Sequence, residues 1–302
     1  MHCYGKRTIL AYIESPLQLL CALEASKGRI NLIVRRNNVK KNNEQIVNLC
    51  NIFSERINIV YTNKNLFFAR IRLALSLVIN SYRHDKIVIG DITSIVFKVI
   101  NRLKIINEKK MIFVDDGVLS LWHQEYAISN NKKKMFTFFE IESARQHKFE
   151  NLKNWLLQNK KIKNKPINVI IGTDYKDLSK TINKNYDCIL DAILKNRNGN
   201  NERFIYVPHR KENEKKLERI KKKYQIEIVK LNLPIELIEY ELECLVLEYN
   251  TMISSSVFTL NLIYECSVVQ TWKSNAIFGE ASNVKKIYNA LPNKIPVNLV
   301  PD

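Results

Sequence analysis

The segment Met111-Ile112-Phe113-Val114-Asp115-Asp116-Gly117 places two carboxylates and a glycine directly behind four apolar residues. A short apolar run that is closed by a turn residue is typical of a buried strand. In open α/β sheets, ligands bind beyond the carboxyl ends of the strands. The segment therefore predicts a strand that delivers negative charge to the ligand-binding edge of a sheet.

Apolar runs and helical patterns alternate from the start of the chain. We expect Ser15 to cap a helix over 16–25, because Pro16 then takes the first helical position. Strands separated by helices form right-handed βαβ units and a parallel sheet. The first half is expected to contain strands at 8–13, 30–34, 57–61, 86–89 and 110–114, with further helices near 42–54, 65–80 and 93–103.

A second alternation follows residues 118–165, for which we expect irregular structure, one or two helices and a linker. In this second alternation we expect strands at 167–171, 204–207, 227–229 and 251–254. We expect helices at 174–195, 212–223 and 234–243, and a further helix from Val257 onward. Two Rossmann-like α/β domains, 1–160 and 161–302, would then have parallel sheets that face one another across a cleft. This is the GT-B architecture.

Charge and composition restrict the class of protein. The chain has 302 residues, 46% of them hydrophobic, and a formal net charge of +18. Lysine runs at 132–134, 160–165 and 215–223 would attract nucleic acid, anionic lipid or a phosphorylated glycan, or are simply solvated helix faces. No run approaches the roughly 20 apolar residues of a membrane-spanning helix. The first residues lack a signal-peptide pattern, so we expect a cytosolic protein.

The six cysteines are scattered and include no Cys-x-x-Cys pair, so neither a disulfide nor a zinc site is expected. Asp-x-Asp, Gly-x-Gly-x-x-Gly and phosphate-loop patterns are also absent from the sequence. Dehydrogenases and P-loop enzymes are therefore excluded. A transferase without a metal must neutralise its leaving group with side chains and backbone, and a nucleoside monophosphate is the easiest such group.

Asp115 and Asp116 are the first candidate site residues. Neighbouring carboxylates point in different directions, so one should face the cleft and the other a structural partner. A carboxylate at a cleft can take a proton from a sugar hydroxyl. The alternatives are a cap for the following helix or a metal ligand.

His209 is the second candidate, because Pro208 and His209 follow the apolar strand pattern Phe204–Val207. An imidazole at a strand end can protonate a departing phosphate or stabilise it as a cation. Arg210 and Lys211 add positive charge beside it. The alternative is a histidine that caps a helix or packs in a core.

A cluster of three hydroxyls, Ser254-Ser255-Ser256, is the third candidate. Hydroxyls and free backbone N–H groups at a helix start bind anions, although serine is also an ordinary helix cap. Glu236 is expected at the start of another helix, where it could bind ribose hydroxyls or balance the helix dipole.

These three motifs, in this order, resemble those of the bacterial sialyltransferases, which have an acidic-acidic-Gly motif, a His-Pro motif and a Ser-Ser motif on a GT-B fold. The chain is most similar to the lipooligosaccharide sialyltransferase family (glycosyltransferase family 52) and its polysialyltransferase relatives. Residues 14–20, Glu-Ser-Pro-Leu-Gln-Leu-Leu, also resemble the start of those proteins. The resemblance extends over about residues 8 to 265.

The resemblance implies that Asp115 is the general base, that Asp116 supports it, and that His209 protonates the CMP phosphate. It implies that no residue binds a metal and that Gly172, Thr173, Glu236, Ser255 and Ser256 bind the donor. Ser254 and Arg210 are expected at the same donor site. Three further residues, Ser15, Gln18 and Gly117, are expected on the acceptor side or in the cleft.

The implied activity is inverting, metal-independent transfer of a nonulosonic acid from its CMP donor to a lipooligosaccharide or capsular glycan. The donor sugar could be sialic, pseudaminic or legionaminic acid, because the His-Pro motif reads His209-Arg210 here and Val207 replaces a lysine of some relatives. Arg210 or Lys211 could substitute for that lysine. No cofactor is expected, and relatives in the family suggest a possible homodimer. The basic runs would keep such an enzyme in peripheral contact with the anionic inner face of the inner membrane.

Two alternatives remain open. In one, a relative of this family transfers another sugar, such as glucose, from a nucleotide diphosphate. In the other, the chain is a non-enzymatic protein that binds polyanions through its basic runs, although the run at 215–223 lacks the interleaved aromatic residues that nucleic-acid binding favours. We expect no nucleic-acid partner.

Overall fold

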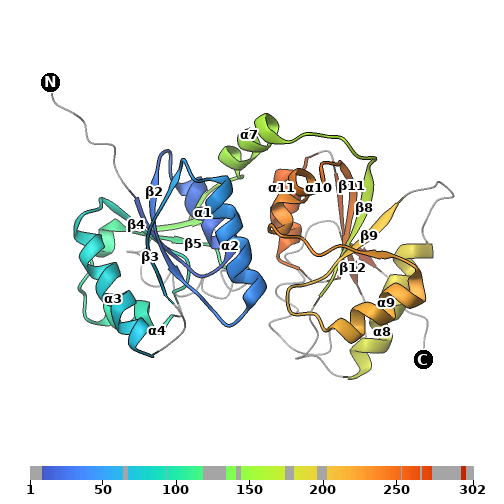
Figure 1. The fold of residues 1–302 in the computed structure, drawn as a ribbon, viewed down its shortest axis with the longest axis horizontal. Helices are drawn as coiled ribbons and strands as arrows, with labels where there is room; N and C mark the ends of the chain where they lie inside the picture. Colours follow the sequence, from blue (N-terminus) through green and yellow to red (C-terminus); the bar gives the residue numbers. More distant parts are fainter. Residues whose placement is uncertain are drawn as a thin grey trace. The chain divides into compact units, whose positions relative to one another are not determined.

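The computed structural model describes residues 9–63, 67–92, 94–117, 134–140, 144–173, 180–195, 203–252, 254–265, 267–273 and 294–296. The chain divides into two compact units (Figure 1). The first contains Met1–Trp155 with Asn232–Pro234, and the second contains Leu156–Leu231 with Ile235–Asp302.

The first unit is built on a seven-stranded parallel sheet in the order β3-β2-β1-β4-β5-β6-β7. The order reverses between β1 and β4, which makes the carboxyl ends of these two strands a topological switch point. The strands are β1 (Ile9–Ile13), β2 (Ile30–Arg35), β3 (Ile57–Asn63), β4 (Lys86–Ile89), β5 (Met111–Val114), β6 (Lys134–Thr137) and β7 (Arg145–Gln146).

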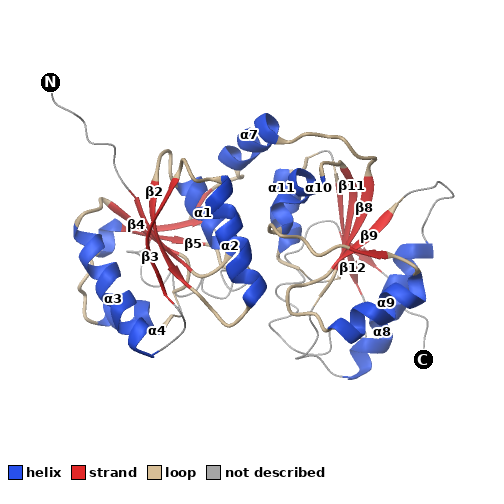
Figure 2. Ribbon diagram, viewed as in Figure 1, coloured by secondary structure: helices blue, strands red, loops and turns tan. Residues whose placement is uncertain are grey.

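Helices cover both faces of this sheet (Figure 2). Helices α1 (Pro16–Ala25) and α2 (Lys40–Ile52) cover one face, and α3 (Phe67–Tyr82) and α4 (Ile95–Arg102) cover the other. All five residues of β1 are buried, as expected for a parallel strand between two helical layers. A short 3-10 helix, η1 (Glu108–Lys110), precedes β5, and α7 (Glu150–Asn159) contains the division between the units.

The second unit is built on a six-stranded parallel sheet in the order β10-β9-β8-β11-β12-β13. Its switch point lies between β8 and β11. The strands are β8 (Ile167–Ile171), β9 (Phe204–Val207), β10 (Glu227–Ile228), β11 (Val246–Thr251), β12 (Val268–Lys273) and β13 (Lys294–Pro296). The helices are α8 (Lys180–Lys195), α9 (Glu214–Tyr224), the 3-10 helix η2 (Ile235–Leu237), α10 (Ile238–Leu242) and α11 (Ser256–Ile263).

Local signals in the sequence predicted several elements correctly. The expected strands at 86–89, 167–171 and 204–207 have these bounds in the structure, and the helix over 16–25 is α1. Its cap is the expected one, because Ser15 Oγ accepts a 3.3 Å hydrogen bond from the backbone N–H of Gln18.

The strand expected at 251–254 is wrong, because β11 ends at Thr251. A polar residue inside β11 obscures its pattern: Asn250 is buried and its Oδ1 accepts a 2.6 Å hydrogen bond from Trp272 Nε1. The helix expected at 234–243 is divided into η2 and α10. Strands β6 and β7 interrupt the segment that we expected to be irregular or helical.

Some expectations concern residues outside those described: residues 118–133, with Lys132 and Lys133, and the first part of the expected helix at 174–195. The four cysteines that the structure describes are Cys21, Cys50, Cys188 and Cys244, and all four are free thiols. Over the described ranges, no helix combines the length and the apolar character that crossing a bilayer requires.

Candidate functional site

The switch point of the first sheet brings together the turns that follow β1 and β4. Gly90, directly after β4, approaches the side chain of Gln18 in α1 so closely that a Cβ at this position would lie 2.3 Å from Gln18 Oε1. The backbone N–H of Gly90 also donates to the carbonyl oxygen of Tyr12. A glycine is therefore required here for Gln18 to take its place at the edge of the sheet.

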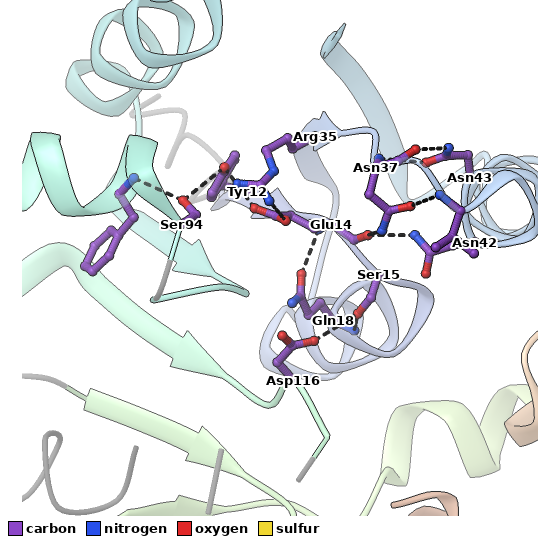
Figure 3. A network of polar contacts seen from close by, with 12 residues as sticks. Tyr12, Glu14, Ser15, Gln18, Arg35, Asn37, Asn42, Asn43, Ser94 and Asp116 are labelled. Carbon is purple, nitrogen blue, oxygen red and sulfur yellow. Dashed lines mark hydrogen bonds and ion pairs between the residues drawn. The ribbon is translucent and has the colours of Figure 1, made fainter. Parts of the chain in front are cut away.

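Glu14, the first residue after β1, lies at the centre of this polar network (Figure 3). Its carboxylate contacts the guanidinium of Arg35 at 2.5 Å and accepts a 3.1 Å hydrogen bond from the hydroxyl of Tyr12. Its backbone N–H donates to Gln18 Oε1 at 2.7 Å, and its carbonyl oxygen accepts from Asn42 Nδ2 at 2.8 Å. Glu14 is therefore fixed through both its backbone and its side chain.

Burial raises the pKa of Glu14 to about 8, although the positive charge of Arg35 acts in the opposite direction. The negative charges of Asp91 and Asp116 raise the pKa further. Three carboxyl groups, each following a different central strand, thus influence one another at this edge. A carboxyl group with a pKa near neutrality is suited to proton transfer.

Asp116 and Gly117 stand beside this network. Asp116 is half-buried, and its Oδ1 accepts a 3.4 Å hydrogen bond from the hydroxyl of Ser15. Gly117 has φ 62°, a left-handed conformation that glycine adopts without strain, so the chain turns directly after the acidic pair. Ser15 and Gln18, expected near the acceptor, therefore lie in the same network as Asp116 (Figure 3). Gly117, the third residue expected there, directly follows Asp116.

Asp115 has different surroundings from Asp116. Its side chain is fully buried, with Oδ1 accepting a 2.7 Å hydrogen bond from Thr137 Oγ1 and Oδ2 accepting a 2.8 Å bond from the backbone N–H of Phe138. These bonds connect the end of β5 to the end of β6. Of the two carboxylates, Asp116 is the more accessible to a ligand and Asp115 holds the turn in place.

A buried histidine packs against Asp115. His147 stacks on Phe136 with 4.4 Å between ring centroids, and its Nε2 lies 3.9 Å from Asp115 Oδ2. Burial lowers the pKa of His147 to about 3, so the imidazole is neutral. The ligand atoms of Cys21, Asp115 and His147 lie within 4.8 Å of one another. A thiol, a carboxylate and an imidazole are all side-chain types that bind zinc in proteins. Both oxygens of Asp115, however, already accept hydrogen bonds.

In the second unit, Glu212 connects the ends of β8 and β9. Its carboxylate accepts a 2.7 Å hydrogen bond from the backbone N–H of His209 and a 2.8 Å hydrogen bond from the hydroxyl of Tyr206. Lys216 Nζ donates to the same carboxylate at 2.5 Å. A Cβ on Gly172 would lie 2.0 Å from Glu212 Oε2, so only glycine fits at the end of β8.

Lys216 extends this connection to the turn after β8. Its Nζ donates a 3.0 Å hydrogen bond to the carbonyl oxygen of Thr173 and lies 4.2 Å from the ring centroid of Tyr186. Gly172, Thr173 and His209, three of the expected site residues, are therefore held by one set of contacts.

The imidazole of His209 is half-buried, and its Nδ1 lies 3.4 Å from the backbone N–H of Lys211. Since this N–H can only donate, Nδ1 is the acceptor, and a neutral imidazole carries its proton on Nε2.

The serine cluster begins α11. Ser254 Oγ and Ser256 Oγ are 2.6 Å apart, and the backbone N–H of Ser256 donates to Ser254 Oγ. Ser255 occupies the capping position, yet its side chain makes no capping hydrogen bond. The backbone N–H groups of Val257 and Phe258 donate to the carbonyl oxygens of Ser254 and Ser255, so what this end of α11 presents is its serine hydroxyls and the positive end of the helix dipole.

Glu236 is buried beside the same helix. Its Oε1 accepts a 2.8 Å hydrogen bond from Thr259 Oγ1, one turn after the serine cluster. Burial raises the pKa of Glu236, while the positive charge of Arg210 acts to lower it. Arg210 thus acts electrostatically on the expected ribose-binding residue.

Sequence reasoning missed Glu14, Arg35, His147, Glu212 and Lys216 as site residues. Glu14 directly follows an expected strand and Glu212 comes three residues after His209, so position was an available signal for both. Arg35, His147 and Lys216 carry no comparable local signal.

No protein-family model matches the chain, and no curated protein matches it by sequence. Solved structures do match its fold. One is the α/β-galactoside α-2,3-sialyltransferase of the luminous marine bacterium Photobacterium phosphoreum, with a TM-score of 0.54 and 12% identity over 97% of this chain and 99% of that one. Another is the UDP-GlcNAc 2-epimerase of Methanocaldococcus jannaschii in complex with UDP-GlcNAc and UDP, with a TM-score of 0.52 and 13% identity over 96% of this chain and 88% of that one. With two doubly wound parallel sheets, the chain has the GT-B fold.

Proposed function

We propose that this chain is an inverting glycosyltransferase that moves a nonulosonic acid from a CMP donor to a terminal sugar, without a metal ion in the transfer step. The observation that carries the proposal is the placement of proton-transfer groups at strand ends: Asp116 and Glu14 at the edge of the first sheet, and a hydrogen-bonded His209 at the edge of the second. The fold shared with a sialyltransferase supports the same assignment.

In the proposed reaction, a carboxylate of the first unit takes the proton of the acceptor hydroxyl. The hydroxyl oxygen forms a bond to the anomeric carbon as the bond from that carbon to the CMP phosphate oxygen breaks. We assign the base to Asp116, because its carboxylate is only half-buried. Asp115 is fully buried, and both its oxygens accept hydrogen bonds. This reverses the roles that the family resemblance implies for the pair, with Asp115 as the positioning residue.

His209 is proposed to give its Nε2 proton to the departing phosphate of CMP. General acid–base assistance of this kind typically contributes about 10²–10⁴-fold. Lys211 orients the ring through its backbone N–H, and Glu212 holds the backbone of His209. Because negative charge develops on the phosphate, donors that are already in place stabilise the transition state without further reorganisation.

The start of α11 is proposed to bind that phosphate. Ser254, Ser255 and Ser256 offer hydroxyls and the positive end of the helix dipole. Arg210 adds positive charge, and Glu236 would accept hydrogen bonds from the cytidine ribose. A nucleoside monophosphate suits such a site because its single phosphate carries less charge to neutralise than a diphosphate.

The donor sugar is proposed to be sialic, pseudaminic or legionaminic acid, and the acceptor a lipooligosaccharide or capsular glycan at the inner face of the bacterial inner membrane. A nucleotide-diphosphate sugar is the second candidate, because the same fold binds UDP-GlcNAc and UDP in the M. jannaschii epimerase.

The test is a thermal-shift titration with CMP, UDP and GDP, followed by an assay of CMP release from CMP-linked sialic, pseudaminic and legionaminic acids. We expect CMP to raise the Tm and at least one of these donors to be turned over. A shift with UDP or GDP alone would favour the second candidate. A salt-sensitive shift with heparin and none with a nucleotide would favour a non-enzymatic polyanion-binding protein.

A further inference from the structure

Helix α3 exposes an apolar stripe. Its outward side chains include Ile71, Leu75, Ile79 and Tyr82, which are from 49% to 72% exposed. Their spacing of four, four and three residues puts them on one side of the helix. The opposite side buries Leu73 and Leu77 against the first sheet. A surface helix normally has charged or polar residues where α3 has this stripe.

Helix α4 carries a second stripe next to the first. Ile95, Val99 and Leu103, at its start, middle and C-terminal cap, are from 48% to 62% exposed. Its inner residues belong to the same core cluster as those of α3, and the two helices lie side by side on one face of the sheet (Figure 2). We call the seven exposed apolar residues of both helices the α3–α4 face. Exposed apolar side chains gathered on two adjacent helices are typical of an interaction site.

The charged residues of helices α3 and α4 all have one sign. Residues 67–84 and 94–107 contain no aspartate or glutamate. The basic residues in these two segments are Arg70, Arg72, Arg83, Lys98, Arg102 and Lys104, and all but Arg70 are exposed. The two helices therefore combine exposed apolar side chains with cationic ones, which is the composition of surfaces that lie in the interface of an anionic bilayer.

We propose that the α3–α4 face docks the protein on an anionic membrane. The alternative is that a second copy of the chain binds to this apolar face. Symmetric pairing of two such faces, however, would bring the same cationic side chains of both copies together. Anionic headgroups neutralise these charges, while Leu75 and Ile79 enter the apolar layer below them.

The face also begins beside the candidate site. Ser94 caps α4 and its hydroxyl lies 3.2 Å from the hydroxyl of Tyr12, which donates to Glu14. Ile95, the first residue of the face, follows Ser94 directly. If the proposed function holds, a docked enzyme would meet a membrane-anchored acceptor at the edge of the first sheet. Docking itself does not depend on that function.

The test is co-sedimentation of the full chain with vesicles of phosphatidylcholine containing 30% phosphatidylglycerol, and with vesicles of phosphatidylcholine alone. We expect binding to the anionic vesicles that weakens as salt is added. Leu75→Gln with Ile79→Gln should lower the partition coefficient at least about tenfold, because two apolar anchors are lost. Arg72→Gln with Lys98→Gln should weaken binding as well and reduce its salt dependence.

The control variants replace exposed residues of other helices. Leu157→Gln on α7 removes an exposed leucine, and Lys215→Gln with Lys222→Gln removes two exposed lysines from α9. Both controls should bind vesicles like the wild type, and the CMP-induced rise in Tm should be the same in all variants. Wild-type vesicle binding by the Leu75/Ile79 variant would overturn the proposal. So would a wild-type dimer that this variant converts to monomers, since the face would then join two copies. Loss of the CMP response alone would count against the proposed function and leave docking intact.

Discussion

The backbone N–H of His209 donates a 2.7 Å hydrogen bond to the carboxylate of Glu212, whose side chain is only 1% exposed. Tyr206 and Lys216 contact the same carboxylate, so the turn that carries the imidazole is anchored to the end of β9 and to the first turn of α9. The position of His209 thus depends on a buried acidic side chain.

Replacing this anchor should impair transfer more than binding. We expect Glu212→Ala to lower kcat at least about tenfold while the KM for the donor changes less, because a displaced acid raises the barrier of the chemical step. Glu212→Gln should recover part of the loss, since its amide oxygen can still accept from His209. Glu214→Gln, which alters an exposed carboxylate paired with Lys230, is the control. Equal kcat in Glu212→Ala and wild type would contradict the anchoring role.

Gly172 should not tolerate a side chain. Gly172→Ala would place a methyl group 2.0 Å from Glu212 Oε2 and 2.7 Å from the Tyr206 hydroxyl. Overpacking of this kind typically costs about 1–3 kcal/mol, measured as the free energy of unfolding in urea. Gly28→Ala is the matched control, because a Cβ there has no neighbour within 4 Å. If both variants unfold at the same urea concentration, Glu212 does not hold the position described here.

The two carboxylates of the Asp115-Asp116 pair should respond differently to neutralisation. Asp116→Asn should fold like the wild type and lose about 10²–10⁴-fold in turnover if Asp116 is the base. Asp115→Asn should lose stability by about 1–3 kcal/mol, because the amide cannot accept from both Thr137 and the N–H of Phe138.

Turnover and the Tm of both variants separate the two roles. A stable Asp115→Asn enzyme without activity, together with an active Asp116→Asn enzyme, would return the base to Asp115.

The buried imidazole of His147 predicts a loss of stability in acid. Its pKa is about 3 in the folded protein, against about 6.5 in the unfolded chain, so the unfolded chain binds the proton first as the pH falls. Below pH 6.5 this group should cost up to about 1.4 kcal/mol per pH unit until the pH nears 3.

His147→Phe keeps an aromatic ring for stacking on Phe136 and removes the titration. The difference in unfolding free energy between this variant and wild type, measured from pH 7 to pH 4, should therefore grow in favour of the variant. A constant difference over that range would mean that the imidazole takes up its proton at the same pH in the folded and the unfolded protein.

Elements whose signals are local were predictable from the sequence alone. The apolar runs at 86–89, 167–171 and 204–207 and the cap formed by Ser15 and Pro16 depend on neighbours within a few residues, and the alternation of such elements indicates parallel sheets. For the same reason the acidic pair and His209 were recognised as residues at strand ends, and the serine cluster as the start of a helix.

Pairing over long distances decided the rest. Strand β11 contains Asn250, whose buried Oδ1 accepts a hydrogen bond from Trp272 on a neighbouring strand. The short strand β6 pairs with the edge of β5, and β7 pairs with the edge of β6. Which carboxylate of the pair is buried depends on Thr137 and Phe138, which follow more than twenty residues later. Sequence therefore determined which chemical groups stand at the ends of the strands. Only the tertiary structure decided their burial and partners, because hydrogen bonds between distant segments form only when the sheet has assembled.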